Sequence, residues 1–284
     1  MRALIFGAAG MLGTDLCAAA PDGTSVVALD VADADITDRA QVAAALRDAR
    51  PDWVLNAAAY TAVDRAETDR AAADAVNGLA AGYVAEEAAR HGVAMVHFST
   101  DYVFAGTATS PYEESDPVAP INAYGESKRR GEEAVLASGA HVLLLRTQWL
   151  FGRAGTSFPR TMWERAIAGL PTRVVNDQVG RPTYTRDLAI ATWQLVERRA
   201  AGVVHATNAG APATWFDVAR LVFARAGAAS LLSPCATADY PTPARRPAYS
   251  ALSTKRLDAL LSHPLPDWRD ALGRFLDELS PARP

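Results

Sequence analysis

The stretch Ala3-Leu4-Ile5-Phe6-Gly7-Ala8-Ala9-Gly10-Met11-Leu12-Gly13 decides the fold of this 284-residue chain. Four apolar residues predict a buried strand, and the G-x-x-G-x-x-G loop after them leads into a helical pattern. Glycines let a backbone turn sharply and approach a pyrophosphate, which then lies at the helix N-terminus. Three glycines also suit a plain turn, but the strand before and the helix after favour a dinucleotide site. We therefore predict that the cofactor binds Gly7, Gly10, Met11, Leu12 and Gly13.

The rest of the first half alternates short apolar runs with alanine-rich helical patterns. Strands separated by helices imply a parallel sheet with right-handed crossovers. We therefore predict an α/β fold, a Rossmann-type doubly wound parallel sheet. The strands are expected at residues 3–6, 25–29, 53–56, 94–98 and 142–146, and the helices at residues 11–19, 39–48, 65–90 and 122–137.

From about Phe151 onward, proline, glycine and threonine punctuate shorter elements. No long linker precedes this part, so we interpret residues 1–150 as the dinucleotide-binding domain. Residues 151–284 are expected to form a smaller C-terminal substrate-binding lobe, interleaved with the last strands of the sheet. Its helices are predicted at residues 186–197, 215–226 and 268–279.

The composition excludes several classes of function. A net charge of −4 argues against a nucleic-acid partner, because phosphate backbones favour basic surfaces. No apolar run approaches a membrane span, and the N-terminus shows no basic-then-apolar leader. Cys17 and Cys235 form no motif. We therefore expect a cytoplasmic protein with neither a nucleic-acid nor a membrane partner.

Asp30 directly follows the apolar run Val26-Val27-Ala28-Leu29. A carboxylate at the end of the second strand can accept hydrogen bonds from the adenosine ribose. A helix cap or a turn is the alternative role, since Asp33 and Asp35 lie close by. No arginine or lysine occupies residues 31–36, so a 2′-phosphate is disfavoured there. The pattern leans toward NADH over NADPH, or toward use of both.

Tyr124 and Lys128 lie one helical turn apart, and Lys128 is one of two lysines in the chain. A phenol is a weak acid, and a neighbouring ammonium is expected to lower its pKa. Thr100 follows the fourth strand and can hold a carbonyl oxygen beside that phenol. Each residue alone could be purely structural, but together with the glycine loop they indicate hydride addition to a ketone, with Tyr124 as proton donor.

The chain resembles the extended short-chain dehydrogenase/reductase family and, within it, the dTDP-4-dehydrorhamnose reductases. The similarity spans essentially the whole chain. It is carried by residues 56–67 (NAAAYTAVDRAE), 99–104 (STDYVF), 124–128 (YGESK), 146–149 (RTQW), 176–183 (NDQVGRPT) and 243–247 (PARRP).

This resemblance implies reduction of the 4-keto group of dTDP-4-dehydro-6-deoxy-L-mannose to dTDP-L-rhamnose, with NADH or NADPH. Tyr124 would donate the proton, with Lys128 and Thr100 completing a catalytic triad. The sugar would contact Thr100, Asp101 and Trp149. The cofactor would further be lined by Asp30, Asp35, Ile36, Ala57, Ala58, Ala59, Tyr60, Thr61, Tyr124 and Lys128.

Arg181 and Arg246 are candidates for the substrate pyrophosphate, because arginine forks match phosphate oxygens. Solvated surface arginine is the alternative for both. Some relatives bind Mg²⁺ at a dimer interface through glutamates, but the corresponding positions here hold Asp15 and Arg186. A cation at a ligand position leads us to predict no metal. A homodimer is possible.

Three alternative functions stay open at this point. A related dTDP-4-keto-sugar reductase of antibiotic or secondary-metabolite glycosylation would share every catalytic residue. An epimerase or dehydratase with bound NAD⁺ would need further acid and base groups, and Asp101-Tyr102 is not an obvious Asp-Glu pair. A non-catalytic regulatory relative would keep the fold, but the intact Thr100, Tyr124 and Lys128 argue against that role.

Overall fold

A computed structural model describes residues 1–280 and has at its centre a sheet of six parallel strands. The strand order is β10-β5-β4-β3-β1-β2, so the order in which strands are added reverses between the neighbours β1 and β3. This confirms the expected Rossmann-type doubly wound fold. The strands are β1 (Arg2–Phe6), β2 (Ser25–Leu29), β3 (Trp53–Asn56), β4 (Ala94–Thr100), β5 (Val142–Thr147) and β10 (Gly202–His205).

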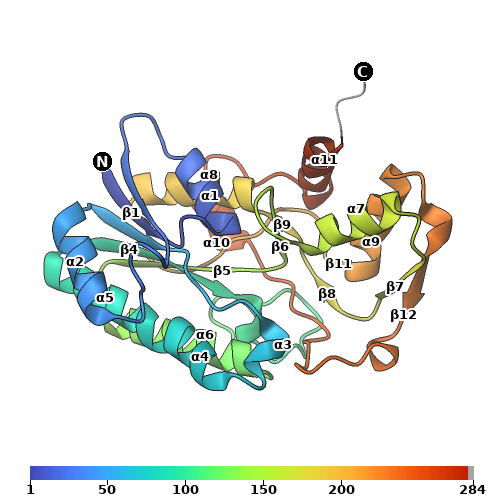
Figure 1. Cartoon of the computed structure of the whole chain (residues 1–284), viewed down its shortest axis with the longest axis horizontal. Coiled ribbons are helices and arrows are strands. Elements are labelled where there is room, and N and C mark those ends of the chain that lie inside the picture. The colour runs from blue at the N-terminus through green and yellow to red at the C-terminus, as the bar shows by residue number, and fades with distance from the viewer. Residues whose placement is uncertain (281–284) are drawn as a thin grey trace.

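Helices cover both faces of the sheet because each strand is apolar on both sides (Figure 1). Ile5 packs in the hydrophobic cluster beneath one set of helices, and its neighbour Leu4 packs in the cluster beneath the other. The first set is α1 (Met11–Ala18), α8 (Thr185–Glu197) and α10 (Lys255–Leu260). The second set includes α2 (Arg39–Ala49), α5 (Ala81–His91) and α6 (Ala123–Ala137).

The single helix expected at residues 65–90 is divided in the structure. It consists of α3 (Val63–Ala66), α4 (Arg70–Asp74), a π-helical turn η1 (Ala75–Ala80) and α5. The π turn places Asn77 so that its amide pairs with both backbone groups of Tyr60, each at 2.9 Å. A π turn commonly accompanies a functional site. Here it holds the loop that follows β3.

The second half of the chain builds a smaller lobe beside the sheet and also supplies the edge strand β10 (Figure 1). A separate hydrophobic cluster fills this lobe. Its helices are α7 (Phe158–Ile167), α9 (Trp215–Arg225) and α11 (Trp268–Leu279). Its short strands pair as β7 (Thr172–Val175) with β12 (Leu232–Cys235), β8 (Val179–Gly180) with β11 (Ala213–Thr214), and β6 (Leu150–Phe151) with β9 (Thr183–Tyr184). The remaining short turns are η2 (Asp101–Val103), η3 (Ala229–Leu231) and η4 (Thr237–Asp239).

The sequence-based prediction missed one helix of the smaller lobe. Helix α7 was not predicted. Its first turn holds Pro159, whose fixed φ suits the start of a helix.

Within residues 1–280, none of the helices combines the length and the apolar character needed to cross a bilayer.

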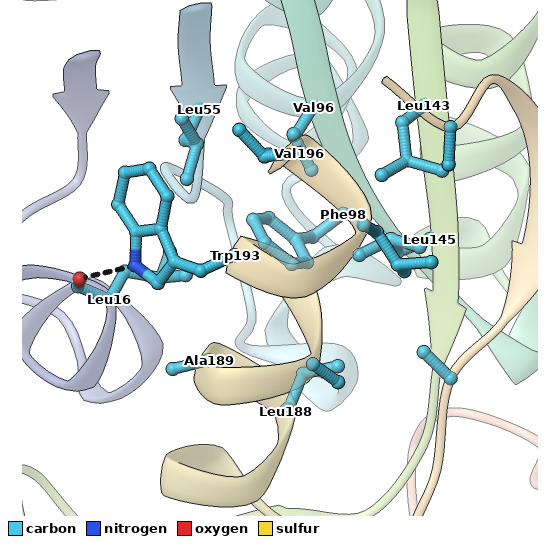
Figure 2. Close-up of a cluster of buried hydrophobic side chains, with 14 of the residues drawn as sticks. Leu16, Leu55, Val96, Phe98, Leu143, Leu145, Leu188, Ala189, Trp193 and Val196 are labelled. Atoms are coloured by element: carbon cyan, nitrogen blue, oxygen red, sulfur yellow. Dashed lines mark hydrogen bonds between the residues drawn. The ribbon is translucent and has the colours of Figure 1, made fainter. Parts of the chain in front are cut away.

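Trp193 joins the two halves of the chain on one face of the sheet (Figure 2). Its side chain is 2% exposed, and its indole N–H donates to the Leu16 carbonyl oxygen at 2.9 Å. Helix α8 is thereby fixed against α1, the helix that opens at the glycine loop. The indole thus satisfies its one donor while burying its whole ring.

We predict that Trp193→Ala lowers the free energy of unfolding by about 3–5 kcal/mol, because it leaves a large cavity and an unpaired carbonyl. Ile190→Ala is the matched control, since Ile190 lies on the same helix and is 43% exposed. That variant should change the free energy by less than about 0.5 kcal/mol. Urea unfolding followed by circular dichroism measures both, and equal losses in the two variants would contradict the packing role.

Candidate active site

A cavity of about 940 Å³ lies at the carboxyl ends of the parallel strands. The loops after β1, β2, β3, β4 and β5 all contribute to its wall, together with α6 and residues of the smaller lobe. Open α/β sheets bind their ligands at this edge, beside the strands where the order reverses. The cavity is therefore the candidate active site.

The glycine loop forms one end of the cavity and fits a dinucleotide. Gly7 has a φ of +74°, and a Cβ there would lie 2.6 Å from the Ala58 backbone nitrogen. A Cβ on Gly13 would lie 2.0 Å from the Gly7 carbonyl oxygen, so Gly13 lets α1 pack on the loop. Helix α1 has Gly10 as its N-cap and no side-chain cap among the described residues. Its first backbone amides are thus available to a phosphate.

Asp30 ties this loop to the second strand. One carboxylate oxygen accepts a hydrogen bond from Ala9 N at 2.8 Å, and the other accepts one from Val31 N at 2.8 Å. Each oxygen keeps a second lone pair for a ribose hydroxyl. Lys128 is the one arginine or lysine among the described residues that line the cavity. The electrostatics at this end therefore offer no partner for a 2′-phosphate, as the sequence suggested.

The structure brings nearly all of the predicted cofactor residues to one cavity. Gly13 is the exception, because it contacts the loop from behind. The residues that line the cavity are Gly7, Gly10, Met11, Leu12, Asp30, Asp35, Ile36, Ala57, Ala58, Ala59, Tyr60, Thr61, Tyr124 and Lys128.

Helix α6 brings Tyr124 and Lys128 to the centre of the cavity. Asn122 caps the helix by accepting a hydrogen bond from Gly125 N at 2.8 Å, which places Tyr124 in the first turn. Lys128 is 2% exposed, and its ammonium donates to the Phe98 carbonyl oxygen at 2.6 Å. The predicted pair therefore lies on one face of a helix docked against the end of β4.

The net shift in the pKa of Tyr124 is upward, opposite to the lowering expected from Lys128. Burial raises the pKa of Tyr124 to about 12, the Thr100 hydroxyl favours the ionised form, and the charge of Asp101 opposes it. The Lys128 ammonium is instead engaged with the Phe98 carbonyl. The phenol is consequently protonated at neutral pH, which is the state a proton donor requires.

Lys128 is itself perturbed by its surroundings. Burial lowers its pKa to about 8, and the carboxylate of Glu132 opposes this shift. Glu132 lies one turn further along α6 and forms a buried ion pair with Arg146 of β5, with Nη2–Oε2 at 2.7 Å. The amine therefore stays charged at neutral pH beside a counterion that is itself neutralised.

Thr100 and Asp101 form a buried pair at the end of β4. The Thr100 hydroxyl donates to Asp101 Oδ1 at 3.1 Å, and Gln148 Nε2 lies 3.4 Å from Oδ2. Asp101 is 2% exposed, and burial raises its pKa to about 7 despite these hydrogen bonds and another from Ser250. Both residues line the cavity. Thr100 Oγ1 also accepts a hydrogen bond from Tyr102 N at 3.2 Å.

An aromatic wall closes the substrate end of the cavity. Trp149 has a φ of +47°, which is unusual for a residue with a side chain, and stacks on Trp215 with ring centroids 3.6 Å apart. A Cβ on Gly180 would lie 2.5 Å from the Trp149 ring, so the absence of a side chain at Gly180 makes room for the ring. Phe158 packs on the other side, 4.6 Å from Trp215. Trp149 was predicted to be here, whereas Trp215 and Phe158 were missed.

The two arginines predicted to bind a pyrophosphate are not among the described residues that line the cavity. Arg181 is buried and donates to the Leu252 carbonyl oxygen at 3.1 Å and to Thr207 Oγ1 at 3.3 Å. Arg246 forms a bidentate ion pair with Asp64. Arg246 is therefore paired with a carboxylate, whereas Arg181 Nε is buried without a hydrogen-bond partner among the described residues. The assignment of both arginines to the substrate pyrophosphate stays a prediction.

Other residues that line the cavity were not named as site residues from the sequence. They are Ala9, Val31, Ala34, Val63, Val76, Phe98, Ser99, Tyr102, Thr147, Gln148, Leu150, Thr156, Ser157, Phe158 and Trp215. Tyr102 could have been inferred from its place beside Thr100-Asp101. The residues of the second half depend on tertiary packing that local patterns do not encode.

The positions considered for a metal lie elsewhere, between α1 and the smaller lobe. Asp15 accepts a hydrogen bond from Thr185, and Arg186 lies 3.5 Å from Glu278. Burial raises the pKa of Asp15. Among residues 1–280, no group of three or more histidine, cysteine or carboxylate side chains is arranged to hold a metal. The absence of a metal stays a prediction.

Known proteins similar to this chain share its full length. The family model described as "RmlD substrate binding domain" matches residues 1–280. A probable dTDP-4,6-dihydroxy-2-methyloxan-3-one 4-ketoreductase of Streptomyces antibioticus is 47% identical, covering 100% of this chain and 98% of that protein. A dTDP-4-dehydrorhamnose reductase of Burkholderia thailandensis is 44% identical, covering 98% and 99%. The structure of a dTDP-4-dehydrorhamnose reductase of Bacillus anthracis in complex with NADP has a TM-score of 0.94 at 34% identity, covering 98% and 99%.

Asp101 provides a test of the electrostatics at this site. Because its pKa is about 7 in the folded protein and near 4 when unfolded, the unfolded chain loses the proton first as pH rises. As pH rises from about 4 to about 7, the free energy of unfolding of the wild type should therefore decrease. The decrease should exceed that of Asp101→Asn by at most about 4 kcal/mol. Urea unfolding at several pH values measures this difference. Parallel pH profiles for the two proteins would show that folding does not raise the pKa of Asp101.

Proposed function

Because the chain belongs to the RmlD substrate binding domain family, we propose that it is a reductase that uses NADPH or NADH to convert dTDP-4-dehydro-6-deoxy-L-mannose to dTDP-L-rhamnose. One observation carries this proposal. The buried Tyr124–Lys128 pair and the Thr100–Asp101 pair line the same cavity as a glycine loop that fits a dinucleotide. The names and full-length similarity of the Burkholderia and Bacillus relatives support the substrate.

The nicotinamide cofactor, when bound, supplies the hydride that the keto carbon receives. The residues of the chain act on the oxygen. Tyr124 is protonated at neutral pH and transfers its proton to the oxygen of the new alkoxide, which is a stronger base than a phenolate. Lys128 holds a positive charge near the phenolate that results. The Thr100 hydroxyl beside the phenol favours its ionised form, which assists release of the proton.

Asp30 and the residues beside it favour NADH over NADPH. The carboxylate can bind a ribose diol, and the described lining offers no arginine for a 2′-phosphate. The Bacillus relative nevertheless binds NADP. Cytoplasmic location and a homodimer remain predictions from the sequence.

The Streptomyces relative supports a second candidate function, because it is 47% identical over the whole chain. The oxanone in its name carries hydroxyl groups at ring positions 4 and 6, so it lacks one hydroxyl that a dehydrorhamnose ring retains. Reduction of such a deoxygenated 4-keto sugar would use the same Tyr124, Lys128 and Thr100. The two candidates differ only in the sugar that the wall around Asp101 and Trp149 accepts.

We predict that Tyr124→Phe lowers kcat by about 10²–10⁴-fold, because it removes the proton donor but keeps the ring. The loss of absorbance at 340 nm on mixing enzyme, NADPH and dTDP-4-dehydrorhamnose measures the rate. Tyr240→Phe is the matched control, since Tyr240 is 57% exposed and should keep the wild-type rate. A fully active Tyr124→Phe enzyme would disprove the role of the phenol.

A panel of substrates separates the two candidate functions. We expect dTDP-4-dehydrorhamnose to give a higher kcat/KM than the analogue that lacks the hydroxyl at sugar carbon 2, by about tenfold or more, because a buried polar wall loses a hydrogen-bond partner. A preference for the deoxygenated sugar would favour the second candidate.

The same assay compares the two cofactors. NADH and NADPH should differ in kcat/KM by less than about a hundredfold, since Asp30 opposes but does not block a 2′-phosphate.

A further inference from the structure

Arg246 makes a bidentate polar contact between the smaller lobe and helix α3 beside the cavity. Its Nη2 donates to Asp64 Oδ2 at 2.8 Å, and its Nη1 donates to Asp64 Oδ1. Asp64 Oδ1 also accepts a hydrogen bond from Ala244 N at 3.0 Å. The two charged residues are 182 positions apart in the sequence, so this contact closes a very long loop. The Arg246 side chain is 17% exposed, whereas the Asp64 side chain is 43% exposed.

Both partners adjoin residues of the cavity. Asp64 lies on α3, next to Val63, which lines the cavity beyond the cofactor loop. Arg246 also hydrogen-bonds the phenol of Tyr102, another residue of the lining. The Tyr102 ring meets the Tyr124 ring edge-on, with centroids 5.9 Å apart. The guanidinium is therefore one side chain away from the proposed proton donor.

The chain on either side of Arg246 is attached to the cavity wall at further points. The carbonyl oxygen of Arg245 accepts a hydrogen bond from Asn122, the cap of α6, at 2.8 Å. The carbonyl oxygen of Ser250 accepts one from Gln148 Nε2 at 2.7 Å, and the Ser250 hydroxyl binds Asp101. We refer to residues 244–250 as the 244–250 segment. Through these contacts the segment is linked to Asp101 and Gln148, and Arg246 links it to Tyr102.

We infer that the Asp64–Arg246 pair is a positioning device that fixes the 244–250 segment and thereby shapes the sugar end of the cavity. Arg246 acts through Tyr102 and the segment, and Asp64 serves as its anchor. This inference rests on the proposed function, because its readout is the reduction of a dTDP-keto sugar. It is an alternative to the expectation that Arg246 binds the pyrophosphate directly.

The test compares Asp64→Asn, Arg246→Gln and the double variant by steady-state kinetics. Each single variant should raise KM for dTDP-4-dehydrorhamnose about tenfold, change kcat less than about threefold and leave KM for NADPH unaltered. The double variant should be no worse than either single, because both remove the same interaction. Arg246→Lys should fall between wild type and Arg246→Gln, since an ammonium cannot form the fork. Arg245→Gln is the matched control, an exposed neighbour expected to keep wild-type constants.

Inhibition by dTDP alone distinguishes a positioning residue from a phosphate ligand. The inference predicts an unchanged inhibition constant in both single variants, because dTDP lacks the sugar that the segment positions. A raised inhibition constant in Arg246→Gln but not in Asp64→Asn would overturn the inference and make Arg246 a pyrophosphate ligand. Additive effects in the double variant, or unchanged KM in either single variant, would also overturn it.

Two further readouts keep the result clear. Circular dichroism checks the fold of each variant, and if Arg246→Gln unfolds, Asp64→Asn carries the test because Arg246 then keeps its bond to the Ala244 carbonyl. Wild-type enzyme is assayed in parallel. Failure of the wild type to oxidise NADPH would reject the proposed function, whereas wild-type turnover with unaltered variants would reject only the inference.

Discussion

The buried ammonium of Lys128 is the interaction on which the site depends. A charge removed from water must be paired or hydrogen-bonded, and Lys128 donates to the carbonyl at the end of β4. This hydrogen bond fixes the position of α6 along β4, and therefore also the position of Tyr124, which lies one helical turn before Lys128. The Glu132–Arg146 ion pair behind the amine connects the same helix to β5. Two neighbouring strands therefore determine where the phenol lies.

The fold and the nucleotide end could be predicted from local patterns, because strand periodicity, the glycine loop and the Tyr124–Lys128 spacing are all encoded over a few residues. The effect of burial on the phenol could not, since the pKa of Tyr124 depends on what the whole fold packs around it. Arg246 shows the same limit at long range. Its charge suggested an anionic ligand, but its partner is a carboxylate in the other half of the chain.

The substrate end was the least predictable part of the site. Trp149 lay in a recognisable motif, yet its stacking partner Trp215 comes from the first turn of α9, far along the chain. Asn77 likewise binds the Tyr60 backbone only because a π turn redirects its amide. Such residues are selected by the geometry of the closed cavity. A helical or strand pattern in the sequence specifies the element that carries them and leaves their partners undetermined.

Strand β10 comes from the second half of the chain but pairs with β5 of the first. The two lobes therefore share a sheet, and neither half contains all of its own hydrogen-bonding partners. Recombination that exchanged the second half between relatives would have to replace an edge strand of the nucleotide-binding sheet as well. New sugar preferences in proteins of this architecture should for that reason arise by substitutions in the cavity wall more readily than by swapping whole modules.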